Sequence, residues 1–227
     1  MDIFRIIELC TVENMCLAEL QEDAQFKKMP AGGVRDYIDS LIKIAAGKAE
    51  KLKNESPKSR LSLSDICRSK GVSVNLVEGS RAQAVGRFRA EIYYDEKIIN
   101  IMKCSIDQMY DVLMNFVVYF GENKNFISVE NIKDMHIAHE LYHLIEYTDG
   151  EYTPDLLPPV TSVNIFGFER RSGVSKASEA AAHIFCMRLL DLPFHPKMLD
   201  YLCLLNAEEV TRERLIEFLG NLKRFMT

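Results

Sequence analysis

Hydrophobic residues recur with the period of an α-helix along most of this chain, most regularly towards its two ends. Residues 1–28 form one such stretch, which we expect to break near Thr11 or Asn14. Residues 34–54 form a second and stronger one. Its inward-facing positions are Tyr37, Leu41, Ile44 and Ala45. The same period predicts further helices at 105–118, 196–205 and 207–224.

The middle of the chain carries the pattern of strands instead. Residues 72–77 and 84–103 are rich in β-branched and aromatic residues, and a turn near Asp95-Glu96 makes the second stretch typical of a hairpin. Prolines and glycines interrupt residues 148–175, where we expect one strand at 160–168 and otherwise a mobile flap over a cleft. Strands placed between helices predict an α+β fold with a small, mostly antiparallel sheet.

One predicted helix contains a motif with specific chemistry, the His-Glu-x-x-His sequence formed by residues 139–143. His139 and His143 are four residues apart, so they share one face of the helix and can converge on a tetrahedral ion. Glu140 lies beside them and can take a proton from a water held there. The motif arises by chance in roughly one sequence of this kind in a hundred, so its context matters.

The context of the motif is an amphipathic helix. Apolar side chains recur on the side away from the two histidines, at Ile137, Leu141, Leu144, Ile145 and Thr148. Asn131 or Asp134 is the expected N-terminal cap, and Gly150 is the expected end. The alternative is that two ordinary histidines lie on a surface helix.

A catalytic zinc site usually has a third protein ligand, and the best candidate is Glu179. It lies in a predicted helix at 176–190 that is rich in alanine and contains no glycine or proline. The small alanines would let this helix approach the first one closely. Glu179 is therefore either the third ligand or a solvated carboxylate favoured by the positive end of the helix dipole.

Together, the two helices resemble those of the ImmA/IrrE-like metallopeptidases. In that family an Ala-His-Glu-Leu-Gly-His helix is followed a few dozen residues later by a Glu-x-x-Ala-Asn-x-Phe-Ala helix that ends Leu-Leu-x-Pro. The resemblance covers roughly residues 60–195. The matching residues here are those of 138–143, then Glu179, Ala182, Phe185, Leu189, Leu190 and Pro193.

The resemblance implies a zincin-like metallopeptidase domain at 58–227, with the sheet packed against the motif helix, preceded by an N-terminal helical segment at 1–57. It implies a zinc-dependent endopeptidase that hydrolyses peptide bonds in a specific protein such as a repressor, with activity that requires a partner or signal. It also implies that Zn²⁺ is held by His139, His143 and Glu179, with Glu140 as the catalytic general base.

Four residues depart from the family's pattern. Tyr142 replaces a glycine inside the motif, while Asp134 and His136 replace a basic residue and a small hydroxyl residue. His183 replaces an asparagine one turn after Glu179. We consider four roles for it: a catalytic donor to a reacting carbonyl oxygen, an orienting partner of Glu179, a fourth ligand that closes the site, or a histidine packed without a chemical role. Tyr142 and a flap residue are the other candidate donors.

Composition narrows the remaining possibilities. A net charge of −5 and a pI near 5.6 argue against direct nucleic-acid binding, and no apolar run approaches the length of a membrane span. The six cysteines form no Cys-x-x-Cys pair, so we expect reduced, mostly buried thiols and a cytoplasmic protein with a protein or peptide substrate.

Two other functions stay open. One is a non-catalytic, zinc-containing protein-binding module in which the fourth metal position is filled. The other is an antitoxin-like scaffold whose N-terminal helices carry the function. An intact Glu140 argues against the second, because a site that has lost its chemistry needs no general base.

Overall fold

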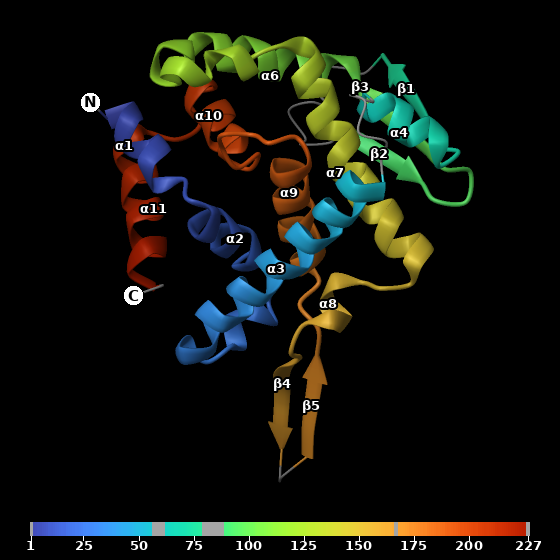
Figure 1. Ribbon diagram of the computed structural model, residues 1–227. Helices are drawn as coiled ribbons and strands as arrows, with labels where there is room; N and C mark the ends of the chain where they lie inside the picture. Colours follow the sequence, from blue (N-terminus) through green and yellow to red (C-terminus); the bar gives the residue numbers. More distant parts are fainter. Residues whose placement is uncertain (1, 56–61, 79–88, 166–167, 226–227) are drawn as a thin grey trace.

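The computed structural model describes residues 2–55, 62–78, 89–165 and 168–225 (Figure 1). Its elements run from helices through a small sheet to further helices, so the predicted α+β class is confirmed. No helix among the described residues is long and apolar enough to cross a membrane.

The N-terminal segment folds as α1 (Asp2–Leu9), α2 (Val12–Leu20), the short 3₁₀ helix η1 (Phe26–Lys28) and α3 (Ala31–Glu55). The predicted break is confirmed at Thr11, whose hydroxyl accepts a hydrogen bond from the amide of Asn14 at 3.2 Å and so caps α2. Helix α3 begins three residues earlier than predicted and includes the glycines at 32 and 33.

The sheet follows α4 (Leu63–Ser69) and contains β1 (Ser73–Val77), β2 (Ala90–Tyr93) and β3 (Ile98–Met102) in the order β1-β3-β2. The β2–β3 hairpin with its turn at 94–97 is confirmed, and residues 84–88 of that prediction lie outside the described residues. Strand β1 runs parallel to β3, so the sheet is mixed and the prediction of a mostly antiparallel sheet is wrong. Strand β3 carries Ile99 and Ile101, both fully buried, and is the central strand. Strands β1 and β3 are separated by β2 in the chain, so no local pattern sets the direction in which they pair.

After the sheet come α6 (Lys103–Asn115), η2 (Val117–Tyr119), η3 (Gly121–Phe126) and the long helix α7 (Val129–Asp149), which carries the motif. The N-cap of α7 is Ser128, whose hydroxyl accepts from the amide of Asn131 at 3.1 Å, so neither predicted cap is correct. Gly150 ends α7 with a φ of 67°, a left-handed conformation that favours glycine.

The chain continues through α8 (Thr153–Leu156) into β4 (Val160–Ile165) and β5 (Phe168–Ser172), which pair as a hairpin where one strand was predicted. This hairpin projects from the body of the molecule (Figure 1). The remaining elements are α9 (Lys176–Leu189), α10 (Met198–Asn206) and α11 (Arg212–Phe225), close to the predicted ranges.

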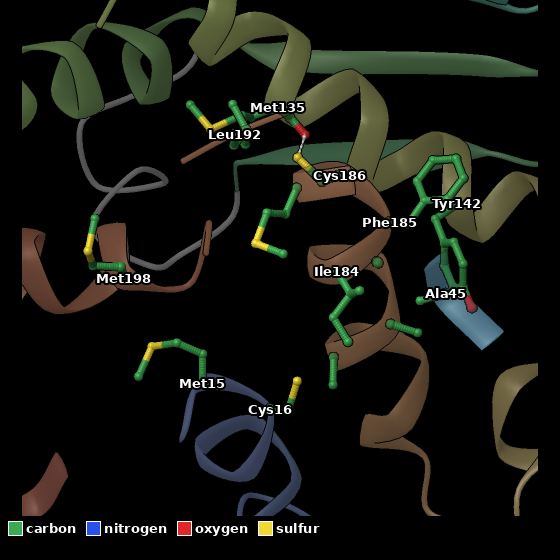
Figure 2. Close-up of a cluster of buried hydrophobic side chains, with 14 of the residues drawn as sticks. Met15, Cys16, Ala45, Met135, Tyr142, Ile184, Phe185, Cys186, Leu192 and Met198 are labelled. Atoms are coloured by element: carbon green, nitrogen blue, oxygen red, sulfur yellow. Dashed lines mark hydrogen bonds between the residues drawn. The ribbon is translucent and has the colours of Figure 1, made fainter. Parts of the chain in front are cut away.

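Helix α9 is the centre of the core. Side chains of α2, α3 and α7 surround its Ile184, Phe185 and Cys186 (Figure 2), and its alanines at 177 and 180–182 are fully buried. These small residues let three helices approach α9 closely. The N-terminal helices therefore share one continuous core with the motif helix. None of the six cysteines, all of which are among the described residues, is part of a disulfide, and four of them are buried.

Candidate metal centre

The structure brings His139, His143 and Glu179 together. The two histidines lie one turn apart on α7, and Glu179 faces them from the first turn of α9. Their Nε2 atoms are 3.3 Å apart. The Glu179 carboxylate oxygens lie 3.3 Å from His139 Nε2 and 3.5 Å from His143 Nε2. All three ligand atoms lie within 4.8 Å of one another, so this group could hold a metal ion.

These separations suit a tetrahedral zinc ion. Ligand atoms about 2.0–2.1 Å from the centre of a tetrahedron stand about 3.3–3.4 Å from one another, close to the distances between these nitrogens and oxygens. Two imidazoles and one carboxylate are also a donor set of catalytic zinc sites, which leave the fourth position for water. The residues present therefore fit this ion.

The charges of the site complement a cation. The hydrogen bond with His139 outweighs the effect of burial and holds the pKa of Glu179 at about 2. Burial acts to lower the pKa of His139, but the hydrogen bond and charge of Glu179 leave that pKa raised. Burial raises the pKa of Glu140, and the two histidines only partly oppose it. Carboxylates crowded around two imidazoles leave negative charge that a divalent ion would neutralise.

A carboxylate that the sequence analysis did not consider holds His143 in place. Glu146 is buried, and its Oε2 lies 3.4 Å from His143 Nδ1. Its Oε1 accepts from the amide and hydroxyl of Thr153 at 2.7 and 2.5 Å and from the Ser178 hydroxyl at 3.1 Å. Burial acts to raise the pKa of Glu146, but these hydrogen bonds leave it lowered. Glu146 therefore stays charged and accepts from His143 Nδ1, which leaves His143 Nε2 free to bind a metal.

One feature of the sequence could have indicated the role of Glu146. Glu146 follows His143 by three residues, so it shares the same face of α7. Its other partners, Thr153 and Ser178, belong to other elements, and sequence spacing does not show that they meet it.

A cavity of about 440 Å³ adjoins the ligands and is lined by Glu140, His183 and Tyr94 among other residues. The predicted general base thus faces an open volume next to the metal position. No residue of 148–161 or 170–175 lines this cavity, so the side chains that the structure describes there do not form the expected flap over the cleft. The β4–β5 hairpin, which contains the predicted strand, projects from the body of the molecule.

His183 lies in the wall of this cavity and is not one of the converging ligands. Its ring centroid is 4.8 Å from that of His139 and 5.6 Å from that of His195. Its Nδ1 is buried without a hydrogen-bond partner among the described residues. Burial, together with the charge of His139, holds the pKa of His183 well below its ordinary value. The ring is therefore neutral and carries one N–H to donate.

Tyr142 is not available to a substrate. Its side chain is fully buried, its ring packs 5.2 Å from that of Phe185 (Figure 2), and its hydroxyl lies 2.6 Å from the Thr153 hydroxyl. Of the three candidate donors to a reacting carbonyl oxygen, Tyr142 is therefore excluded, because the helix turns this position into the core. Tyr94 lines the cavity instead, and nothing in the sequence distinguished it from its neighbour Tyr93.

The other two departures lie in different surroundings, and in the described part of the chain only His136 has a polar partner there. His136 is buried, and its Nε2 lies 3.3 Å from the Ser105 hydroxyl. Burial, with the charges of Arg89 and His139, lowers the pKa of His136 to about 3, so it is neutral. Asp134 has one oxygen, Oδ1, that is buried without a partner among the described residues.

A cluster of charged residues also lines the cavity. The buried ammonium of Lys197 contacts Glu19 and lies 3.3 Å from Glu22, and Lys176 lies 2.9 and 3.2 Å from the same two carboxylates. Glu19 belongs to α2 and Lys176 to α9. The N-terminal segment therefore contributes directly to the wall of the candidate site.

Comparisons of the chain with family models, with curated proteins and with solved structures find no match in any of the three.

Proposed function

We propose that this protein is a zinc-dependent endopeptidase of the kind that its two motifs resemble, the ImmA/IrrE-like metallopeptidases. The observation that carries the proposal is the convergence of His139, His143 and Glu179 beside a cavity that Glu140 lines. Its substrate would be a specific protein, such as a repressor, which is an expectation from the resemblance.

The arrangement favours a catalytic site over a structural one. Structural zinc sites have four protein ligands, whereas catalytic sites have three and an open position. In the described part of the chain, the converging group contains three residues and leaves His183 outside it. The open position would face the cavity.

The mechanism assigns one role to each group. A zinc ion at this site would supply a Lewis acid and lower the pKa of a water. Glu140 accepts the proton of the attacking water and delivers it to the leaving amine. His183 and Tyr94 line the same cavity and are the candidates to donate a hydrogen bond to the carbonyl oxygen as it gains charge.

An extended peptide could reach the site along strand β2. Among the described residues β2 pairs with β3 alone, and it is an edge of the sheet. Ala90 at its start and Tyr94 just after its end line the cavity. Backbone pairing at such an edge gives affinity with modest side-chain specificity. Residues 87 and 88, which precede β2, lie outside the described residues.

The first test is the metal content of the wild type, Glu179→Ala, Glu140→Gln and Glu130→Ala, purified in parallel without added metal. We expect about one zinc per chain in the wild type and in Glu140→Gln, and a loss of zinc in Glu179→Ala. Glu130 is an exposed carboxylate in the first turn of α7, so Glu130→Ala controls for loss of a nearby charge. Glu140→Gln would then serve to trap a substrate that the wild type cleaves.

Each contrary result has a definite meaning. No zinc in the wild type after reconstitution would exclude a zinc peptidase. Equal zinc in Glu179→Ala and the wild type would remove Glu179 from the ligand set and make His183→Ala the next variant. Zinc that leaves only when the protein unfolds, with no substrate trapped, would favour the non-catalytic module.

A further inference from the structure

A second cavity, of about 660 Å³, lies on the other side of α7 from the metal ligands, between α7 and α3. Its volume is in the range of small-molecule sites, about 300–1,000 Å³. Apolar side chains line it from both helices and from α8. They are Ile44, Leu52, Leu141, Leu144, Ile145 and Leu156.

The wall formed by α3 contains a glycine in the middle of a 25-residue helix. Gly47 lines the cavity, and a Cβ placed on it would meet no atom within 4 Å. Glycine at such a position costs about 1 kcal/mol of helix stability relative to alanine. No described atom packs close enough to Gly47 to require a glycine there. The missing side chain therefore adds free volume to the cavity.

One end of the cavity is positively charged. Lys51, Lys70 and Lys97 line it near Glu55, which lies 3.8 Å from Lys70. Among the described lining residues of the whole cavity, five lysines outnumber the three carboxylates, which are Glu55, Asp149 and Glu151. The amide of Ser73 donates to the carbonyl of Lys97 at 2.9 Å, which fixes the β2–β3 turn beside the end of α4, where Lys70 stands. Lys97 has a φ of 53°, a left-handed backbone conformation that is unfavourable for residues other than glycine or asparagine.

The length of the cavity along α3 limits the occupant. The Lys48 ammonium donates to the carbonyl of Glu151 at 3.0 Å, and both residues line the cavity. Lys48 and Glu55 are seven residues apart on α3, which is about 10 Å along the helix axis. An extended chain advances about 1.2 Å per bond, so about eight to ten carbons span this distance. The cavity volume of about 660 Å³ and the lysines of its lining suit a small anionic ligand of this length.

We propose that this cavity binds a medium-chain anionic amphiphile, a molecule with an acyl chain of about ten carbons and a carboxylate or similar head group. The chain lies on the apolar side chains of α3 and α7, and the head group lies among Lys51, Lys70 and Lys97. This proposal does not depend on the metal site, because the two cavities lie on opposite sides of α7.

The test measures binding of sodium decanoate by isothermal titration calorimetry, with 1-decanol and decyltrimethylammonium as probes of the same chain length. We expect one decanoate per chain, bound at least tenfold more tightly than decanol and more tightly still than the cation. Affinity should fall as salt is added, since the lysines are exposed. Octanoate should bind about tenfold more weakly than decanoate, because it buries two fewer methylene groups.

Two kinds of variant locate the site. Gly47→Leu fills the cavity from a position that has room for a side chain, and we expect at least a tenfold loss of decanoate affinity. Gly220→Leu is the matched control, because Gly220 is also within a helix and its Cβ would meet no atom within 4 Å. Lys51→Gln combined with Lys97→Gln should weaken decanoate and leave decanol unchanged. Circular dichroism and thermal unfolding show that each variant is folded.

Three results would overturn the proposal. Decanoate affinity that is equal in Gly47→Leu and Gly220→Leu would place the ligand elsewhere. Decanol that binds as tightly as decanoate would exclude recognition of the anionic head. An acidic amphipathic peptide that binds where decanoate does not would make this a docking site for a partner helix.

Discussion

The two faces of α7 share one helix but do different things. The face towards α9 carries His139, His143 and Glu146, whose polar atoms meet one another or the side chains of neighbouring elements. The opposite face carries Ile137 and Leu141, which are buried and contribute burial of apolar surface alone. One face therefore positions chemistry, and the other stabilises the fold.

The difference between the two faces of α7 is clearest in two carboxylates, Glu146 and Asp134. Glu146 on the metal face accepts three hydrogen bonds through one oxygen, and its pKa is lowered. Asp134 lies on the apolar face, three residues before Ile137, and burial raises its pKa to about 6. Its Oδ1 has no partner among the described residues. The charged form of a carboxylate is thus stabilised where hydrogen-bond donors surround it and destabilised where it is buried without them.

The largest effect is expected from Ile137→Ala. Ile137 is fully buried, so its truncation removes apolar contacts and leaves a cavity, which typically costs about 2–5 kcal/mol of stability. Urea unfolding measures this loss, and the folded variant should keep the metal content of the wild type. Leu156→Ala, at a side chain that is 45% exposed, is the control and should cost less than about 0.5 kcal/mol. A loss of metal from folded Ile137→Ala would show that the two faces are not separable.

The second largest effect is expected from Glu146→Gln, on the face of α7 that carries His139 and His143. Glu146→Gln keeps the shape of the side chain but replaces one acceptor oxygen with an NH₂ group that cannot accept from His143 or Thr153. Loss of such a carboxylate typically lowers metal affinity by about 10–100-fold, because the histidine is no longer oriented. Competition with a chelator measures the change, and Glu130→Gln on the exposed part of α7 is the control. Unchanged affinity would mean that His143 keeps its orientation without Glu146.

The contrast also explains what the sequence could predict. A spacing of four residues fixes His139 and His143 on one face without further information, and the alanines around Glu179 indicate a close helix contact. Glu146 was missed because Thr153 and Ser178 meet it only through the tertiary fold.

Other errors have the same origin. Helical period alone could not show that Tyr142 points to Phe185, because that contact depends on where α9 lies. The parallel pairing of β1 with β3 joins segments that are not adjacent in sequence, so local pattern favoured a simple antiparallel sheet. Contacts between distant segments decide strand direction and side-chain packing, and a local sequence pattern does not contain them.

The third prediction concerns Asp134 and depends on pH. Its pKa is about 6 in the folded protein and about 3.9 in the unfolded chain, so the native state binds more protons between these values. Stability from this group is therefore highest below about pH 4 and falls as pH rises to about 6. Asp134→Asn removes the charge, and we expect it to stabilise the protein by about 1 kcal/mol at pH 7.5 and by nothing near pH 4.

Thermal unfolding of Asp134→Asn and the wild type at both pH values, with chelator present, measures this difference. Asp149→Asn, at an exposed position on the same helix, controls for a change in net charge. A difference that is the same at pH 4 and pH 7.5 would show that ionisation of Asp134 does not affect stability.

The smallest expected effect tests whether the apolar side of α7 faces free volume. Gly47→Ala adds one methyl group where a Cβ meets no atom within 4 Å, so it should gain helix propensity without a clash. We expect a stabilisation of about 0.5–1 kcal/mol in urea unfolding. Gly71→Ala should do the reverse, because Gly71 has a φ of +72°, which a side chain strains. If Gly47→Ala destabilises the protein, the added methyl group clashes, and there is no free volume between α3 and the apolar face of α7.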